Sequence, residues 1–311
     1  MPSLLSRRAG RRAPSGRLGL VEITFAGVLW GTGGVVVRLL HDHAAIPAIS
    51  IAFYRLAVGA LALLGIAGRR PRRLVAALRA SPGLVALTGV GLGAYQALYF
   101  VAVTDVGVGV ATMISIGLAP LLTTAWEAAR QRRSPGLGVT ARIALASGGL
   151  ALVSLGAVAP SHTSPHPLVG LACALGSGVG YAATTLVSRH VGSTLDPVTL
   201  TTLSSAAGAL ALAPLAAASG LGFAPRAAPV AELAYLGAMT TAAAFVLFYR
   251  GLRTTPASTA AVLTLLEPVV AAGLATLVLG DPLPATTLLG GVLVIGSVAA
   301  IYASAPPAMT S

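Results

Sequence analysis

Long runs of apolar residues, separated by short polar segments, fill most of this sequence. Each run has about 20 residues, the length that an α-helix needs to cross the hydrocarbon core of a bilayer. None alternates between apolar and polar residues, as the strands of a membrane β-barrel do. The pattern predicts ten transmembrane helices, at Leu18–Leu40, Ala48–Ala67, Gly83–Thr104, Val106–Ala128, Ala141–Val158, Leu168–Ser188, Pro197–Ala218, Ala231–Tyr249, Pro256–Leu279 and Ala285–Ala303. Only Asp105 and its neighbouring glycine mark the boundary between the third and fourth helices.

The composition agrees with a membrane protein. Of the 311 residues, 56% are hydrophobic and 9% are charged, and the mean hydropathy is +0.87. Soluble domains carry about 25% charged residues, so this chain has too few charges to cover a surface that faces water. The predicted fold class is therefore an all-α membrane protein.

All 20 basic residues are arginines, and their distribution predicts the orientation of the chain. Seventeen lie on one side of the predicted membrane, two lie on the other side, and Arg55 lies within the second predicted helix. Short loops rich in arginine stay in the cytoplasm, so we expect an inner or plasma membrane protein with both termini in the cytoplasm. The net charge of +12 does not predict nucleic acid as a partner, because the arginines flank apolar runs instead of forming a basic face.

The two halves of the chain resemble each other at a shift of about 148 residues. The matching segments are Leu20-Val21 with Leu168-Val169, Gly59–Leu63 with Gly208–Leu212, and Ala119-Pro120 with Glu267-Pro268. Five helices per half is an odd number, so the second half must enter the membrane from the opposite side. Such inverted repeats are typical of secondary transporters. The predicted organisation is a disordered basic tail at 1–17, five-helix repeats at 18–158 and 168–303, and a C-terminal tail at 304–311.

Two charged residues lie inside predicted helices. Glu267 is in the middle of the ninth, where an ionisable side chain faces the protein interior or an aqueous cavity and is a functional candidate. It either binds a solute or a coupling proton, or it has the structural role of pairing with Arg55 or capping backbone freed by Pro268. Arg55 can bind a carboxylate through its two-pronged guanidinium, but structural pairing is the favoured interpretation.

Polar, aromatic and proline residues predict a central cavity. Pro120 and Pro268 fall in corresponding helices of the two halves, where proline removes a backbone donor and bends the helix. The residues expected to bind substrate there are Trp30, Tyr95, Gln96, Tyr99, Ser115, Tyr181, Thr184, Thr240, Thr264 and Glu267, with Arg55, Pro120 and Pro268 in structural or coupling roles. The third, fourth, eighth and ninth helices would form the cavity, with contributions from the first and sixth. For any single Ser or Thr, ordinary helix packing is the alternative.

No motif in the sequence predicts a metal, a cofactor or a catalytic site. Cys173 is the only cysteine, and it lies in an apolar run. His41-Asp42-His43 lies in a short loop without a third ligand nearby. No Ser, His and Asp stand in the context that a hydrolase requires, so we expect a protein that is not an enzyme.

Several segments, in this order and spacing, resemble the EamA-like transporters of the drug/metabolite transporter superfamily. They are Trp30-Gly31, Phe53–Leu56, Ala97–Tyr99, Val108–Pro120, Phe248–Leu252, Ala257–Pro268, Leu279–Asp281 and Leu289–Gly296. Asp281 stands where the family commonly has Glu. Gly178 and Ala119 stand opposite Trp30 and Glu267 in the other half, so we expect an asymmetric site.

The resemblance implies an inner-membrane carrier of small metabolites, amino-acid-like or drug-like. We therefore expect a secondary transporter that works by alternating access, with export as the predicted direction and with the lipid bilayer and a small solute as partners. The chain would act as a monomer or a homodimer. The alternatives are a membrane-embedded sensor or enzyme, or a channel. A sensor or enzyme would need a cluster of reactive residues, and a channel would need a ring of like polar groups.

Overall fold

The computed structural model describes residues 16–67, 71–156, 166–192 and 194–305, and all regular structure within these residues is helical. The elements are α1 (Gly16–Ala44), α2 (Ala48–Ala67), α3 (Pro71–Ala80), α4 (Pro82–Gln131), α5 (Leu137–Gly156), α6 (Pro167–Val191), α7 (Pro197–Ser219), α8 (Ala227–Tyr235), the π-helix η1 (Leu236–Ala243), α9 (Ala244–Gly251), α10 (Ala257–Leu263), α11 (Leu266–Leu274), the π-helix η2 (Ala275–Leu279) and α12 (Ala285–Ser304). The predicted all-α membrane fold class is confirmed.

Nine helical stretches within these residues are long and apolar enough to cross a membrane. One of them, α2, has the predicted bounds at both ends, and the others begin or end within a few residues of the prediction. The helix α3 was not predicted, because it is only 10 residues long and carries three arginines. Most of the predicted N-terminal tail lies outside the described residues, and its last two positions belong to α1. Of the predicted C-terminal tail, Ser304 ends α12 and 306–311 lie outside the described residues.

The 50-residue helix α4 contains two antiparallel arms joined without a loop. A straight helix of this length would be about 75 Å long, more than twice the thickness of the hydrocarbon core. Gly107 has non-helical angles, φ 79° and ψ 160°, which suit a residue without a Cβ atom. The hydroxyl oxygens of Tyr99 and Thr112 are 2.8 Å apart, although 13 residues of straight helix rise about 20 Å. The chain therefore folds back at Gly107.

Two other membrane-spanning stretches are interrupted. The segment Ala227–Gly251 passes through the π-helix η1 at its centre. The segment Ala257–Leu279 breaks into α10 and α11 at Thr264 and Leu265. Each interruption ends two residues before a residue that lines the pocket described below, Phe245 in the first case and Glu267 in the second. The first is a π-helix, a form that is frequent at functional sites.

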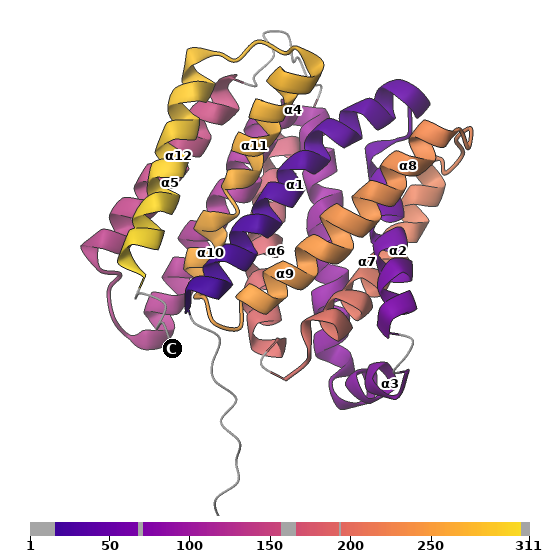
Figure 1. Ribbon diagram of the computed structural model, residues 1–311, viewed down its shortest axis with the longest axis horizontal. Helices are drawn as coiled ribbons and strands as arrows, with labels where there is room; N and C mark the ends of the chain where they lie inside the picture. Colours follow the sequence, from indigo (N-terminus) through magenta and orange to yellow (C-terminus); the bar gives the residue numbers. More distant parts are fainter. Residues whose placement is uncertain (1–15, 68–70, 157–165, 193, 306–311) are drawn as a thin grey trace, which may run out of the picture.

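The helices pack in pairs that join the two halves of the chain. The helix α2 packs along α7, α5 along α12, and α4 along α6, while α1 packs against α9 and α11 (Figure 1). Small residues allow these approaches. A Cβ atom added at Gly89 would lie 2.4 Å from the side chain of Ala207 on α7, and one at Gly149 would lie 2.6 Å from the backbone oxygen of Gly290 on α12.

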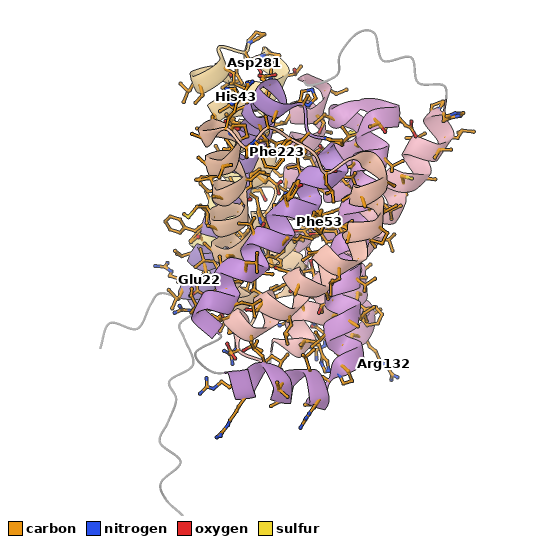
Figure 2. All side chains as sticks on the ribbon, turned by 90° about the vertical axis from the view of Figure 1, so that its right-hand side faces the viewer. Glu22, His43, Phe53, Arg132, Phe223 and Asp281 are labelled. Carbon is orange, nitrogen blue, oxygen red and sulfur yellow. The ribbon has the colours of Figure 1, made fainter. Side chains whose placement is uncertain are left out.

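The outside of the bundle is apolar and the charges lie at its two ends. Leu168, Leu210 and Leu277 are 79%, 74% and 82% exposed, as expected for side chains that face lipid. One end, called the basic end here, carries α3 and Arg132, and the opposite end carries His43 and Asp281 (Figure 2). The helix α1 begins and α12 finishes at the basic end (Figure 1).

Candidate solute-binding site

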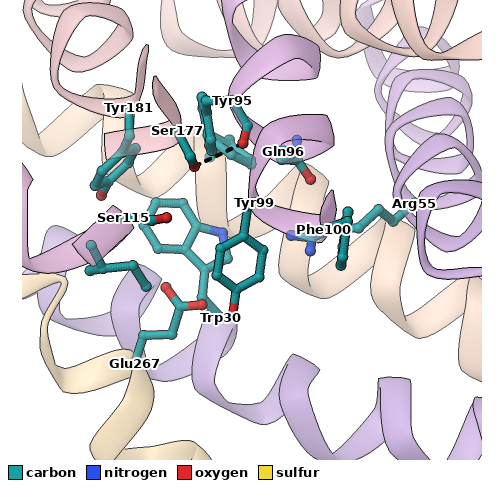
Figure 3. A pocket seen from close by; sticks show the side chains of 12 residues that line it. Trp30, Arg55, Tyr95, Gln96, Tyr99, Phe100, Ser115, Ser177, Tyr181 and Glu267 are labelled. Carbon is teal, nitrogen blue, oxygen red and sulfur yellow. Dashed lines mark hydrogen bonds between the residues drawn. The ribbon is translucent and has the colours of Figure 1, made fainter. Parts of the chain in front are cut away.

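A pocket of about 120 Å³ lies between the two halves of the chain. Its lining residues are Trp30, Arg55, Tyr95, Gln96, Tyr99, Phe100, Ser115, Ile116, Ser177, Tyr181, Phe245 and Glu267 (Figure 3). Six of these twelve side chains are aromatic, and only Arg55 and Glu267 carry formal charges. The pocket is therefore an apolar chamber with a few polar groups, the usual composition of a small-molecule site.

Glycine next to Trp30 brings α1 against α11. A Cβ atom added at Gly31 would lie 2.7 Å from the backbone oxygen of Glu267 and 2.6 Å from the side chain of Val270. Trp30 itself packs on the other side against Phe245 and Phe248, with ring centroids 5.0 and 5.2 Å away. Trp30 thus forms part of the pocket wall, and Gly31 allows the backbone that carries Glu267 to lie against α1.

The break between α10 and α11 sets the direction of Glu267. Pro268 has no N–H to donate to the carbonyl of Thr264, and the backbone N–H of Glu267 donates to that carbonyl instead, at 3.0 Å. The hydroxyl of Thr264 donates to the carbonyl of Ala261, at 2.9 Å, and accepts from the hydroxyl of Tyr181, at 3.1 Å. The ninth span therefore contains a turn at Thr264 and Leu265, directly before the helix that carries Glu267 into the pocket. By contrast, α4 continues as a helix through Pro120.

Polar side chains on α4 and α6 are fixed by the protein. The hydroxyl of Tyr99 bonds to that of Thr112, and the hydroxyl of Ser115 donates to the carbonyl of Ala174 at 3.1 Å. The hydroxyl of Ser177 donates to the carbonyl of Tyr95 at 2.9 Å. The amide nitrogen of Gln96 donates to its own helix, at the carbonyl of Leu92, at 3.1 Å. Most neutral polar groups of the pocket therefore have protein partners.

Arg55 enters the pocket from α2, beside the π-helix η1. Its Nε donates to the hydroxyl of Thr241 at 3.4 Å. Close packing holds the two elements together, because a Cβ atom at Gly59 would lie 2.7 Å from the side chain of Thr241 and one at Gly237 would lie 2.4 Å from that of Val58. The terminal nitrogens of Arg55 have no hydrogen-bond partner among the described residues.

The two charges of the pocket are near each other and are not directly paired. Their nitrogen and oxygen atoms lie beyond the 4.0 Å of a salt bridge, although both side chains line the same pocket. Figure 3 shows Glu267 and Arg55 pointing into the pocket from different sides, with Trp30 and Tyr99 between them in this view. The carboxylate of Glu267 has no hydrogen bond to any described residue. Among the described residues, the carboxylate of Glu267 therefore makes neither a direct ion pair with Arg55 nor a hydrogen bond to the backbone near Pro268, the two structural roles considered for it.

Seven of the ten residues expected to bind substrate line the pocket, and three do not. The lining ones are Trp30, Tyr95, Gln96, Tyr99, Ser115, Tyr181 and Glu267. Thr184 lies at the contact between α6 and α4, where a Cβ atom at Gly91 would be 2.7 Å from its hydroxyl. Thr240 donates to the carbonyl of Leu236 at 2.7 Å, and Thr264 is bonded as described above. Thr240 and Thr264 thus bond their hydroxyls to carbonyls of their own spans, a common role in membrane helices.

Five lining residues were not among the candidate substrate-binding residues. Arg55 had been given a structural or coupling role, and Phe100, Ile116, Ser177 and Phe245 had been given none. Phe100 lies four residues after the predicted Gln96, and Ser177 lies four before Tyr181, so helical spacing was a usable signal for these two. Ile116 directly follows Ser115 and therefore lies on a neighbouring part of the helix surface, where this spacing gives no signal. Phe245 follows a π-helix, which apolar spacing does not reveal.

Acidic side chains at the basic end join helices of the two halves. Glu127, at the end of α4, accepts a hydrogen bond from the backbone N–H of Ala257 at 2.8 Å and one from the hydroxyl of Ser258, at the start of α10. The same carboxylate lies 3.9 Å from Arg189, at the end of α6. Glu22 on α1 pairs with Arg250 on α9 at 2.7 Å.

The opposite end has polar contacts of its own. Arg38 on α1 forms a salt bridge with Asp281, directly after η2. The Nδ1 atom of His43 lies 2.8 Å from a carboxylate oxygen of Glu232 on α8. The pocket therefore lies between two sets of polar contacts, most of which join α1 or α4 to the eighth and ninth spans.

Comparisons with known proteins agree with this architecture. The sequence profile of the EamA-like transporter family matches residues 17–155 and 168–303. The chain is 30% identical to the uncharacterized transporter YwfM of Bacillus subtilis over 283 residues, which cover 88% of this chain and 92% of that protein. It is 26% identical to the uncharacterized inner membrane transporter YicL of Salmonella typhimurium, over 91% of this chain and 95% of that protein.

A third relative has a named substrate. The probable terminal-alkyne amino-acid exporter of Streptantibioticus cattleyicolor is 31% identical over 280 residues, 87% of this chain and 89% of that protein. A solved crystal structure superposes with a TM-score of 0.76 at 18% identity, covering 94% of this chain and 98% of the other, and supports the fold alone. Two matches of one family profile, together covering most of the sequence, and three transporter relatives lead to one conclusion: the chain is a membrane protein of the EamA-like transporter family.

Proposed function

We propose that this protein is a secondary transporter that moves a small organic metabolite out of the cell by alternating access, through ten membrane spans arranged as two inverted five-helix repeats. The observation that carries the proposal is the pocket between the two halves. Trp30, Arg55 and the pocket residues of α4 come from the first half, whereas Tyr181 and Glu267 come from the second. A site shared by both halves at the centre of the bundle is where such transporters bind solute.

The packing of the helices supports the inverted repeat. With the two arms of α4 counted as the third and fourth spans, the second packs on the seventh, the fifth on the tenth, the third and fourth on the sixth, and the eighth and ninth on the first. Exchanging the two halves leaves this set of pairs unchanged. A pseudo-two-fold axis that relates the two halves would produce such a symmetric set of helix pairs.

Two ion pairs support alternating access by the same symmetry. Glu127 and Arg189 join the ends of the fourth and sixth spans at the basic end, and Asp281 and Arg38 join the ends of the ninth and first spans at the opposite end. The exchange of halves converts one pair of spans into the other. Breaking one pair at a time would expose the pocket to one side of the membrane at a time.

The arginine-rich side supports a cytoplasmic basic end. Arg72, Arg79 and Arg132 are at the end where α1 begins and α12 finishes, and arginine-rich loops remain in the cytoplasm. Both termini would then be cytoplasmic.

Pocket size and the relatives support a small metabolite as the exported solute. The volume of about 120 Å³ is below the roughly 300–1,000 Å³ of sites for drug-sized ligands. One relative is named as a probable amino-acid exporter. Glu267 is the proposed proton-coupling group, because it is the only acidic side chain among the lining residues.

A comparison of metabolite pools tests the function. Cells with and without the protein are compared for internal and external small metabolites, and any solute that changes is measured again as uptake into proteoliposomes containing the purified chain. We expect at least one solute to accumulate outside cells that express the protein, and Gln96→Ala and Glu267→Leu to reduce this effect. Unchanged pools, or transport that is insensitive to both substitutions, would contradict the proposed function or the proposed site.

A further inference from the structure

The short helix α3 lies at the basic end, between two membrane-spanning helices. It follows α2, which ends at Ala67, and precedes α4, which begins at Pro82. Figure 1 shows it lying across this end of the bundle, beyond the end of α2. Its 10 residues form a helix about 15 Å long, too short to cross the hydrocarbon core. Because the chain leaves the hydrocarbon before α3 and enters it again afterwards, α3 is held at the level of the lipid headgroups.

The helix α3 packs on the protein with one face and exposes apolar and basic side chains on the rest of its surface. Ala77 is only 4% exposed, where α3 packs against α4 and α7. Val75 and Leu78 are apolar but 45% and 44% exposed, and Arg72 and Arg79 are exposed as well. Helices with this division of apolar and basic side chains lie in the plane of the membrane interface, with the apolar side chains toward the acyl chains.

Two arginines of α3 line one groove on its surface. The lining residues are Arg72, Val75, Ala76 and Arg79. Positions 72, 76 and 79 have the spacing of a single helix face, so the two arginines are two turns apart with the apolar residues between them. A guanidinium offers parallel donors that match the oxygens of a phosphate group. The groove therefore combines donors for a phosphate with an apolar lining.

The described part of the chain supplies no counter-charge for this groove. Neither Arg72 nor Arg79 forms a salt bridge with a described acidic side chain. The acidic side chains of this end, Glu22, Glu127 and Asp196, are bonded to other groups of the protein. The negative partner of the two arginines is therefore expected from outside the chain, and at the level of the headgroups the abundant anion is a lipid phosphate.

We propose that α3 binds the headgroup of an anionic phospholipid, with the phosphate between Arg72 and Arg79 and the start of the acyl chains against Val75 and Leu78. This site is separate from the central pocket and does not depend on the transported solute. Each arginine near an anionic membrane surface contributes roughly a fivefold gain in affinity. A zwitterionic lipid gains less, because its own ammonium group offsets the phosphate charge.

Quenching of a fluorophore on α3 measures lipid binding at this place. Cys173→Ala removes the only native cysteine, and Ala80→Cys, at an exposed position at the end of α3, carries the fluorophore. The purified full-length protein in a neutral detergent is titrated with phosphatidylglycerol whose acyl chains are brominated, or with phosphatidylcholine that has the same chains. We expect phosphatidylglycerol to reach half of its full quenching at a concentration at least about 10-fold lower. Excess inorganic phosphate should leave this quenching unchanged.

Paired substitutions assign the binding to the groove. Arg72→Gln together with Arg79→Gln should raise the half-quenching concentration of phosphatidylglycerol by roughly 10- to 30-fold and change that of phosphatidylcholine much less. The matched control is Arg130→Gln together with Arg133→Gln, which removes the same charge from exposed positions after and at the end of α4. The control should bind phosphatidylglycerol like the parent protein. Because all four side chains are exposed, thermal unfolding should be the same in every variant.

Four results would overturn the proposal. Equal quenching by the two lipids would show that the lipid charge is not recognised, and an equal loss in both double variants would show that net charge, not the groove, attracts the lipid. Reversal of the quenching by inorganic phosphate would identify a site for free phosphate in place of a lipid. The absence of quenching by phosphatidylglycerol would show that the lipid does not bind at α3.

Discussion

Removing the carboxylate of Glu127 is expected to open the basic end of the protein. The Glu127→Ala substitution deletes the acceptor for the N–H of Ala257 at 2.8 Å and for the hydroxyl of Ser258. It also removes the partner of Arg189 at 3.9 Å. These contacts are the side-chain bonds by which the end of α4 is joined to α10 and α6.

The magnitude follows from the kind of each contact. Loss of the bond to the N–H at the helix start costs about 1 kcal/mol, and loss of a charged hydrogen bond to a hydroxyl costs roughly 1.5–3 kcal/mol. The partly exposed Arg189 adds less than about 1 kcal/mol. We therefore expect about 3 kcal/mol, which corresponds to a shift of roughly 100-fold in the ratio of closed to open basic ends, at about 1.4 kcal/mol per tenfold change.

Labelling of a cysteine in the pocket measures this shift. Cys173→Ala removes the only native cysteine, and Ser177→Cys places a thiol in the pocket wall. A membrane-impermeant maleimide is added to membrane vesicles of either orientation. Glu127→Ala should raise the labelling rate from the side that bears the basic end, with little change from the other side.

The matched control acts at the opposite end. Asp281→Ala removes the partner of Arg38 and should raise labelling from the other side only. If both variants increased labelling from the same side, or if Glu127→Ala changed neither rate, the ion pairs would not control access to the pocket and the symmetry argument would be refuted.

Three further predictions concern packing, coupling and topology. Gly31→Ala should lower the stability of the purified protein by about 1–3 kcal/mol, measured by thermal unfolding, because the added Cβ atom would lie 2.7 Å from the backbone oxygen of Glu267. Gly273→Ala is the control and should be neutral, because nothing lies within 4 Å of its added Cβ atom. An equal loss of stability in both variants would contradict the packing argument. Transport by Glu267→Gln should not respond to a pH gradient across proteoliposomes, because an amide binds no proton in this range; an unchanged response would exclude the coupling role. Tags placed at the two ends of the chain should both be accessible from the cytoplasm, and tags on opposite faces would contradict an even number of spans.

Much of the fold could be predicted because lipid imposes one strong rule. Backbone polar groups in a bilayer must bond within their own helix, so each long apolar run becomes a helix, and α2 has the predicted bounds. The prediction missed α3 because length was the criterion. The apolar residues Leu74, Val75 and Leu78 have the spacing of one face of an amphipathic helix, with arginines before and after them. A search for this spacing would have predicted α3.

The pocket could be predicted less completely, because polarity in a membrane helix has two causes. Glu267 and Gln96 are costly to bury in a membrane, and Tyr95, Tyr99 and Tyr181 are bulky, so their positions indicate a cavity. Thr184 and Thr240 have hydroxyls that a helix backbone or a neighbouring helix accommodates, so they resembled cavity residues without lining it. Phe245 could not be predicted from the spacing of apolar residues. A π-helix precedes it and changes the direction of the side chains that follow.

The fold-back at Gly107 has a consequence for how the pocket would change shape. Because no loop separates the two arms, and Tyr99 is bonded to Thr112 across them, we expect the part of α4 that holds Tyr95 and the part that holds Ser115 to move together. A change in the shape of the pocket would then be expected at the turn at Thr264 and Leu265 in the ninth span. Substitutions that stiffen this turn should therefore slow transport more than substitutions that loosen the contact between the two arms of α4.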